Sequence, residues 1–145
     1  MFDLNESLKL LTQLHSIEDN LELTWKPVNG AVMIDADRTH INRLFTNLIQ
    51  NALQSIPDNK KANIVMQEML SETHVLVTIQ DNGSGITEAV RSKIFTPNFT
   101  TKTSGTGLGL AMCKGIVEES KGNIWFETII GSGTTFFVEL PLVPD

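Results

Sequence analysis

The sequence is poor in several features that mark other classes of protein. Cys113 is the single cysteine in 145 residues, so no intrachain disulfide can form. No apolar run approaches the roughly 18 residues of a membrane-spanning helix, and Met1-Phe2-Asp3 does not open a signal peptide. Positive charge is scarce, with 11 Lys and Arg against 17 Asp and Glu. The net charge of -6 repels a phosphate backbone, so we expect no nucleic-acid partner.

What remains is the composition of a folded globular domain. Hydrophobic residues make up 41% and charged residues 19%, which argues against a disordered tail. A chain of this length can bury a core without metals or disulfides, so we expect one domain over residues 1–145. His15, His40 and His74 share no metal-ligand spacing, so we expect structural or surface roles for them. We also expect a cytoplasmic location and no membrane contact by this fragment, although a longer parent protein can carry an anchor.

Hydrophobic periodicity predicts the order of helices and strands. The leucines of residues 4–14 have the spacing of a one-sided helix that Asp3 or Asn5 can cap, and segments 21–27 and 30–35 favour a small hairpin. The other expected elements are a largely buried helix from Asp37 to Ile56, a hairpin of 62–70 and 73–80, one or two helical turns over 88–95, a mobile loop over 96–107, a helix over 108–122 stopped by Gly122, and a final hairpin of 124–130 and 134–142. This order indicates an α+β fold class, a two-layer sandwich with helices on one face of a mixed, mostly antiparallel sheet.

Two polar features accompany these elements. Asn47 and Asn51 lie one turn apart at the edge of the apolar stripe of the long helix, and an amide oxygen is a ligand suited to Mg²⁺. Asp81 opens the segment 81–86, DNGSGI, at the end of a strand. A carboxylate there can accept a hydrogen bond from an exocyclic amino group such as that of adenine. The alternatives are solvated surface amides and an ordinary turn.

A glycine-rich segment, SGTGLGL over 104–110, precedes the last helix. Free N–H groups at a helix start favour an anion such as a phosphate, whereas flexible linkage is the alternative. The spacing of these glycines differs from the Rossmann and Walker patterns, and no strand immediately precedes them. Lys102, in the same loop, can meet a phosphate or remain solvated.

Taken together, these segments resemble the ATP-binding catalytic domain of sensor histidine kinases, in the superfamily of DNA gyrase, MutL-type repair proteins and heat-shock chaperone ATPases. The matching segments are NLIQNALQSI over 47–56, DNGSGI over 81–86, IFTPNFTTK over 94–102, GTGLGL over 105–110 and GSGTTFFVELP over 131–141, similar to the N, G1, F and G2 boxes and the terminal strand motif. The wording FTTKTSGTGLGLA is similar to nitrogen-regulation-type sensors. The resemblance implies a Bergerat fold, about three helices on a mixed sheet, with ATP between the long helix and a lid loop.

The resemblance also implies roles for individual residues. Asn51 would bind Mg²⁺, Asn47 would support the phosphates, Asp81 would accept from the adenine amino group, and Thr134 would lie beneath the ring through a water. The remaining implied contacts are Gly83, Gly85 and Ile86 at the adenine pocket, Gly105, Thr106, Gly107, Leu108 and Gly109 at the triphosphate, Lys102 approaching from the lid, and Phe95 and Phe99 anchoring the lid on apolar surface. Three positions depart from the family pattern: Asn98 replaces a common Phe, and Gln54 and Ser55 replace a Lys and an aromatic residue.

The family's dimerization helices, which carry the phosphoacceptor histidine, have no counterpart here. FDLNESLKLL resembles the stretch that follows them, so residues 1–16 are expected to end a linker from that domain. The resemblance implies transfer of the ATP γ-phosphoryl group to a histidine of the absent domain, with a response regulator downstream. The alternatives are a slow ATPase, which is disfavoured because Asn47 stands where hydrolysing relatives have a Glu base, and a non-catalytic ATP or ADP sensor.

Overall fold

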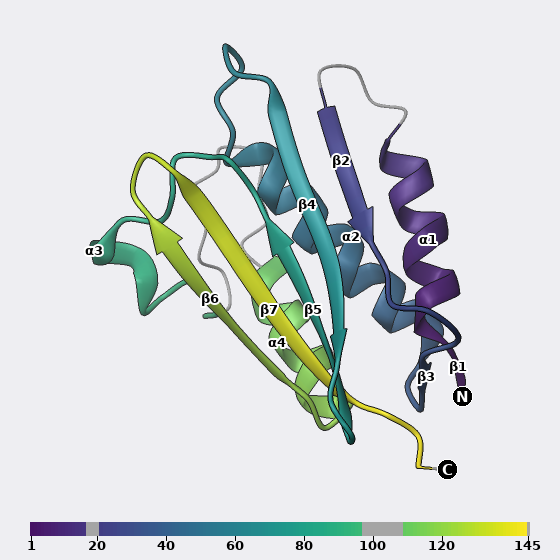
Figure 1. The fold of residues 1–145 in the computed structure, drawn as a ribbon. Helices are drawn as coiled ribbons and strands as arrows, with labels where there is room; N and C mark the ends of the chain where they lie inside the picture. Colours follow the sequence, from purple (N-terminus) through teal and green to yellow (C-terminus); the bar gives the residue numbers. More distant parts are fainter. Residues whose placement is uncertain (17–20, 97–108, 145) are drawn as a thin grey trace.

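The computed structural model describes residues 1–16, 21–96 and 109–144 (Figure 1). Its helices are α1 (Leu4–His15), α2 (Arg38–Gln54), α3 (Glu88–Arg91) and α4 (Gly109–Glu119), and its strands are β1 (Phe2–Asp3), β2 (Leu21–Lys26), β3 (Met33–Ile34), β4 (Ala62–Leu70), β5 (His74–Gln80), β6 (Asn123–Ile129) and β7 (Gly133–Pro141). One sheet has five strands in the order β2-β4-β5-β7-β6, and β1 pairs with β3 in a second, two-stranded sheet. Helices α1, α2 and α4 cover one face of the large sheet, which confirms the predicted α+β sandwich.

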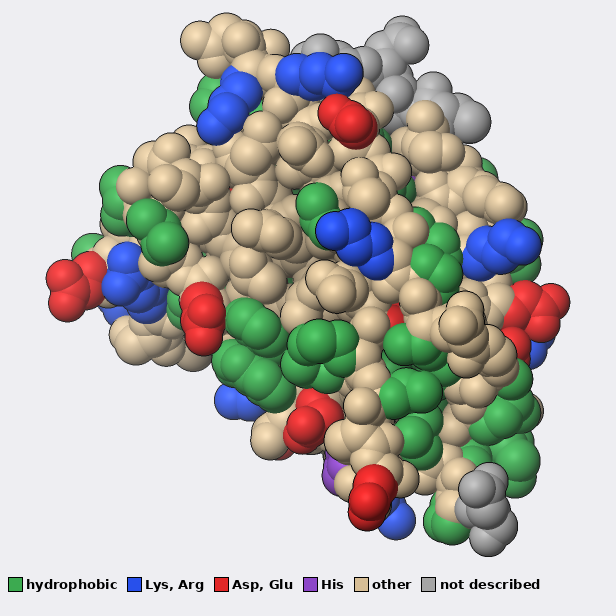
Figure 2. All heavy atoms as spheres, viewed as in Figure 1, with side chains coloured by type: hydrophobic (Ala, Val, Ile, Leu, Met, Phe, Trp, Pro, Cys, Tyr) green, Lys and Arg blue, Asp and Glu red, His purple; other side chains and the backbone are tan. Residues whose placement is uncertain are grey.

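The large sheet is mixed, as expected. Strands β4, β5, β7 and β6 pair antiparallel, and β2 pairs parallel with β4. Alternate residues of the central strands are buried under the helices, for example Ile64 and Met66 on β4 and Val75 and Val77 on β5. This alternation is the period-2 pattern of a half-buried sheet. Figure 2 shows the face without helices, where hydrophobic side chains gather in the lower half between charged ones.

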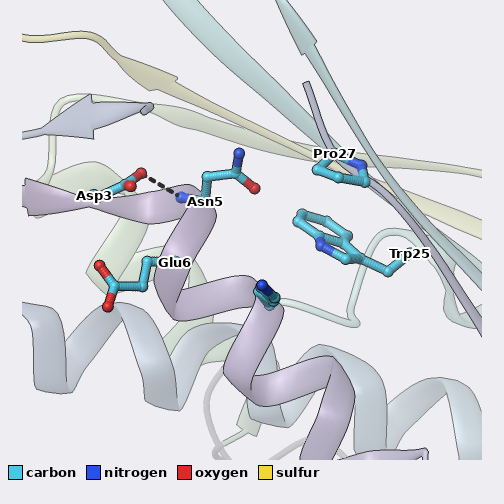
Figure 3. Close-up of a pocket in the computed structure, with 6 residues that line it drawn as sticks. Asp3, Asn5, Glu6, Trp25 and Pro27 are labelled. Carbon is cyan, nitrogen blue, oxygen red and sulfur yellow. Dashed lines mark hydrogen bonds between the residues drawn. The ribbon is translucent and has the colours of Figure 1, made fainter. Parts of the chain in front are cut away.

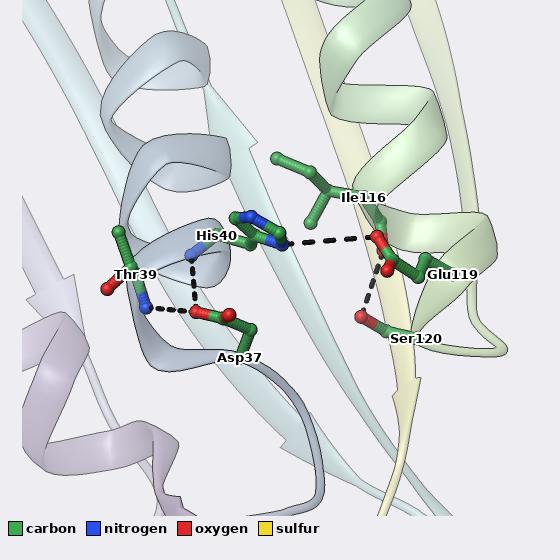
Figure 4. Close-up of polar contacts among 6 residues, drawn as sticks. All are labelled: Asp37, Thr39, His40, Ile116, Glu119 and Ser120. Atoms are coloured by element: carbon green, nitrogen blue, oxygen red, sulfur yellow. Dashed lines mark hydrogen bonds and ion pairs between the residues drawn. The ribbon is translucent and has the colours of Figure 1, made fainter.

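Helix α2 is the centre of the helical layer. Asp37 caps it by accepting hydrogen bonds at Oδ1 from the N–H groups of Thr39 (2.9 Å) and His40 (3.2 Å) (Figure 4). The fully buried side chains on α2 are Ile41, Leu44, Phe45, Leu48 and Ile49. Helix α4 packs alongside, where the Cys113 thiol donates to the Leu44 carbonyl (3.7 Å). These large apolar side chains turn one side of α2 toward the core, and the packing therefore fixes which side of the helix faces away from it.

The predicted hairpin of 21–27 and 30–35 is wrong. Strand β2 pairs with β4, and β3 pairs with the N-terminal residues of β1. The Leu4 N–H donates to the Val32 carbonyl (2.7 Å), and the Val32 N–H donates to Asp3 Oδ1 (2.9 Å). Asn5 Nδ2 donates to the carbonyl oxygens of Val28 (3.0 Å) and Gly30 (2.9 Å). The N-terminal residues therefore bind the segment that hydrophobic periodicity predicts to form a local hairpin.

Other boundaries follow the predictions with small differences. Asp3 caps α1, because its side chain accepts from the Asn5 N–H (3.0 Å), but Leu14 is 65% exposed and does not join the buried stripe. The predicted helix over 108–122 ends at Glu119, and the left-handed residue beyond it is Lys121 rather than Gly122. Most of the expected loop over 96–107 lies outside the described residues.

The N-terminal residues belong to the same core as the rest. Phe2, Leu4 and Leu8 are buried in the cluster that also contains residues of α2 and β4. That residues 1–16 also end a linker from another domain stays a prediction. Within the described ranges, no helix is both long enough and apolar enough to cross a lipid bilayer.

Candidate functional site

Two of the three polar segments singled out in the sequence meet at the C-terminal end of α2. A Cβ atom at Gly83 would collide with the Oγ and the backbone of Ser55, the residue that caps α2. The Ser84 N–H donates to the Ser55 carbonyl (3.1 Å), and the Ser55 N–H donates to the Asn51 carbonyl (3.1 Å). The turn after β5 thus lies directly against the helix end, one turn from Asn51. Glycine is required at position 83 because the two backbones approach so closely.

Asp81 is the buried carboxylate of this site, with 6% of its surface exposed. Its Oδ1 accepts hydrogen bonds from the N–H groups of Gly83 (2.8 Å) and Thr134 (3.1 Å). Burial raises the pKa of Asp81, and these two bonds, a side-chain bond from Ser55 and the charge of Lys60 lower it. Both backbone bonds end on Oδ1, and a carboxylate has more lone pairs than these bonds use, so it can accept from a further donor. A carboxyl group with these properties is typical of functional sites.

A chain of hydroxyl groups joins the turn to the last hairpin. Thr134 is 4% exposed, and its Oγ1 lies 2.9 Å from Oγ1 of Thr128. The Ile86 N–H donates to Thr128 Oγ1 (2.8 Å). Gly85 has a φ of +84°, and a Cβ there would collide with the backbone of Ile129. Position 85 therefore needs glycine for two reasons, left-handed backbone and close approach.

Sequence reasoning missed Ser55 and Thr128 as parts of this site. In the sequence, Ser55 stands out only as a departure from the family pattern. Thr128 lies opposite Thr134 in the register of β6 and β7. The predicted final hairpin, with its register worked out, would have placed Thr128 beside Thr134. The structure brings together Asp81, Gly83 and Thr134 directly, and Ile86 through Thr128.

The asparagines lie on the polar edge of α2, as their spacing predicted. Both residues are half-buried. Asn47 Nδ2 is fully buried and has no hydrogen-bond partner among the described residues. An unsatisfied buried amide is rare in proteins, and rotation of the amide presents either its oxygen or its NH₂ group. The side chain therefore has an unused NH₂ donor, which suits an acceptor such as a phosphate oxygen.

The phosphate half of the predicted site is only partly described. Five predicted residues lie outside the described ranges, and these are Lys102, Gly105, Thr106, Gly107 and Leu108. Phe99 and Asn98 lie there too. Gly109 is the first residue of α4, and a Cβ atom there would meet none of the described residues within 4 Å.

Phe95 packs where a lid anchor was predicted. Its ring centroid lies 6.1 Å from that of Phe126 and 6.4 Å from that of Phe136, and Lys114 Nζ lies 5.9 Å from it. Aromatic and cation–π contacts of this kind stabilise the end of the segment that leads to residue 97. The anchoring role of Phe95 stays a prediction.

A pocket of ≈420 Å³ lies elsewhere, between α1 and β2 (Figure 3). Its lining residues are Asp3, Asn5, Glu6, Lys9, Trp25 and Pro27. None of the predicted site residues lines it. The described residues contain no group of three or more His, Cys, Asp or Glu side chains that could hold a metal ion.

The α+β fold and the arrangement of residues around Asp81 are those of a family of ATP-binding domains. Residues 36–144 match the family model described as "Histidine kinase-, DNA gyrase B-, and HSP90-like ATPase", so the chain belongs to this family. Within it, the chain is an ATP-binding catalytic domain of the histidine kinase type, as its relatives indicate. The resemblance read from the order of the boxes is thereby confirmed.

One curated relative and two solved structures illustrate the similarity. The chain is 35% identical over 140 residues to the signal transduction histidine-protein kinase AtoS of Escherichia coli (strain K12), covering 97% of this chain but only 23% of that protein. It superposes on the catalytic domain of histidine kinase ThkA in a nucleotide-free form with a TM-score of 0.84 and 33% identity, covering 99% of this chain and 97% of that one. It also matches ThkA in complex with the response regulator protein TrrA, with a TM-score of 0.79, 31% identity and coverage of 99% and 41%.

Proposed function

We propose that this domain binds Mg-ATP and transfers its γ-phosphoryl group to a histidine on a dimerization domain outside this chain. The observation that carries the proposal is the buried carboxyl of Asp81, held by backbone N–H groups at the junction of β5, β7 and the end of α2. The whole activity is a proposal because the chain spans only about a quarter of AtoS.

Adenine is the base that this carboxylate suits. Asp81 can only accept hydrogen bonds when ionised, and its second oxygen can accept from the 6-amino group. Gly83 and Gly85 let the turn after β5 pack directly against Ser55 and Ile129, which fixes the backbone that carries Asp81. The hydroxyl groups of Thr128 and Thr134 provide donors and acceptors for a bridging water beneath the ring. Ile86 supplies part-buried apolar surface to the same pocket.

The metal and the phosphates belong to the asparagine side of α2. We assign Mg²⁺ to Asn51 and support of the phosphates to Asn47, whose buried amide has capacity to spare. When bound there, Mg²⁺ would supply positive charge that neutralises the phosphates. Lys102 and the segment of Gly105, Thr106, Gly107, Leu108 and Gly109 are assigned to the triphosphate from their sequence pattern.

Transfer is favoured over hydrolysis by the residue at position 47. A hydrolysing enzyme needs a base to take a proton from water, and an amide cannot accept one at neutral pH. The domain therefore acts by positioning ATP for an incoming histidine and by stabilising charge. A response regulator as downstream partner is supported by the ThkA–TrrA complex. The cytoplasmic location and a membrane anchor in the parent protein remain predictions.

A reconstitution experiment tests the proposal. We would mix this domain with the dimerization domain of its parent kinase and ATP labelled on the γ-phosphate. We expect label on the dimerization domain in a bond that is stable to base and labile to acid, as for phosphohistidine. Asp81→Asn should reduce labelling at least tenfold, because an amide can present a donor to the adenine amino group. Asp35→Asn, at an exposed carboxyl, is the matched control and should leave it unchanged.

The other outcomes distinguish the alternatives. Label released as free phosphate without transfer would indicate an ATPase. Nucleotide binding with neither transfer nor release would indicate a sensor module. Unchanged nucleotide affinity in Asp81→Asn would remove Asp81 from the adenine pocket.

A further inference from the structure

Asn82, the residue after Asp81, connects the turn after β5 to the segment between α2 and β4. Its Oδ1 accepts from the N–H of Asn63 (2.9 Å), and its Nδ2 donates to the carbonyl of Lys61 (3.0 Å). Its own carbonyl accepts from Nζ of Lys60 (2.7 Å). These three hydrogen bonds join Asn82 to three residues within the range 60–63, which lie 19 to 22 positions earlier in the chain.

The bridge is one of two attachments of the turn that follows Asp81. On one side, Gly83 and Ser84 contact the end of α2 at Ser55. On the other, Asn82 is bound to the segment that leads away from α2. The backbone on the C-terminal side of Asp81 is thus held at two points, both attached to the helix that carries the asparagines. We call Lys60, the Lys61 carbonyl, the Asn63 N–H and Asn82 the strap.

The strap also places a positive charge near Asp81. The charge of Lys60 lowers the pKa of that carboxyl, against the effect of burial. Lys60 itself is exposed, so its hydrogen bond is the feature that keeps the ammonium close. The neighbouring Lys61 pairs instead with Glu22 on β2 (4.0 Å). Of two adjacent lysines, only one directs its side chain to this turn.

We propose that Asn82 and Lys60 are positioning residues of the adenine site: they fix the carboxylate of Asp81 relative to α2, so that it accepts from the 6-amino group. The proposal rests on the proposed function, because it assumes that Asp81 binds adenine. A hydrogen bond weakens steeply when donor and acceptor are misaligned, so a small movement of the turn lowers affinity for the amino group. It leaves contacts to the phosphates unchanged, because these lie on other segments.

A pair of ligands isolates this effect. ADP and purine riboside 5′-diphosphate differ only in the 6-amino group, so the ratio of their Kd values measures recognition of that group. We would measure both by isothermal titration calorimetry with Mg²⁺ for the wild type, Asn82→Ala, Lys60→Met, Lys60→Arg, Lys61→Met and Asp81→Asn. Thermal melting without ligand would verify that each variant is folded. A variant that fails to fold would be replaced by Asn82→Asp, which retains the acceptor for Asn63.

The expected pattern is specific. The wild type should prefer ADP by about tenfold, the magnitude of one hydrogen bond to a charged group. Asn82→Ala should reduce this preference by about fivefold and Lys60→Met by about threefold, while affinity for the riboside diphosphate stays the same. Lys60→Arg should restore the preference, and Lys61→Met should not change it. A general loss of structure would instead lower the affinity for both ligands equally.

Two results would overturn the inference. In the first, Asn82→Ala and Lys60→Met prefer ADP as strongly as the wild type does, and Asp81→Asn loses the preference. This result would leave the proposed function intact and show that the strap does not position Asp81. Equal weakening of both ligands would assign Asn82 and Lys60 a purely structural role. Failure of the wild type to bind ADP at all would instead overturn the proposed function.

Discussion

Glu68 is a second buried carboxyl group, outside the candidate site, and its burial affects stability. It projects from β4 into the core, is 3% exposed, and accepts one long hydrogen bond from the Val28 N–H at Oε1 (3.3 Å). Its Oε2 has no partner among the described residues. The pKa of Glu68 is raised from 4.5 to about 7, because burial and, to a smaller extent, the carboxylate of Asp3 raise it by more than the Val28 bond lowers it.

This group makes stability depend on pH in a defined direction. Between pH 4.5 and about 7 the native state holds a proton that the unfolded state has lost, so stability falls as pH rises through this window. Above pH 7 the full penalty is present, roughly 3 kcal/mol for a shift of this size. We expect Glu68→Gln to stabilise the protein at pH 8 by up to about 3 kcal/mol and to leave it nearly unchanged at pH 4.5.

Urea unfolding of the wild type and of Glu68→Gln at several pH values checks this prediction. The difference between the two proteins should grow from pH 4.5 to 7 and then stay constant. Taking the difference removes the contribution of Asp81, whose pKa is also raised and which both proteins share. A difference that does not vary with pH would contradict the assigned pKa of Glu68.

At the scale of elements, two neighbouring residues at the end of α4 have different roles in ending the helix. Lys121 has a φ of 64°, in the left-handed region that favours glycine. Gly122 has no such φ, but a Cβ atom there would collide with the backbone of Glu139 on β7. The Gly122 N–H donates to the Val117 carbonyl (2.8 Å), which closes the helix. The glycine was predicted as the stop, and its actual role is close contact between α4 and the sheet.

The strain at Lys121 leads to a prediction. Lys121→Gly should stabilise the protein by about 1 kcal/mol, because glycine adopts the left-handed conformation without a Cβ penalty. Lys121→Ala is the matched control, since it removes the side chain but keeps the Cβ, and it should have little effect. Urea unfolding at constant pH measures both. Equal changes in the two variants would show that the side chain, not the backbone, is responsible.

The pairing of elements illustrates the limits of local signals. The wrong hairpin at 21–27 and 30–35 arose because two short apolar segments with a turn between them satisfy the hairpin pattern. The competing partner, β1, is two residues long and has no periodicity of its own. Its hydrogen bonds to Val32 come from a segment 29 positions away. An ion pair such as His40–Glu119 (3.9 Å, Figure 4), between exposed side chains of α2 and α4, likewise has no local signal.

For the whole molecule, binding and folding are linked. A ligand that binds only the native state stabilises it by about 2.7 kcal/mol at a concentration of 100 times Kd. We therefore expect Mg-ATP to raise the melting temperature by several degrees. Asp81→Asn should show a smaller increase, and Mg-GTP, which has no 6-amino group, should have less effect on the wild type. Absence of any increase at millimolar Mg-ATP would contradict the proposed ATP site.

The sequence by itself determined the helices and strands, with one misassigned hairpin, and the order of the nucleotide motifs. These features depend on residues close together in the chain, such as the cap of α2 at Asp37 or the alternation along β5. Their physical cause is local backbone preference and the period of the buried face, which a short window of residues contains.

Only the tertiary structure decided which distant groups share the surroundings of Asp81. One of the two backbone N–H groups that bind Asp81 comes from Thr134, 53 positions along the chain, and the ammonium that opposes the effect of burial reaches the turn from Lys60. Burial and electrostatic field at a carboxyl group depend on every atom packed around it, whatever its position in the chain, so no local pattern contains them.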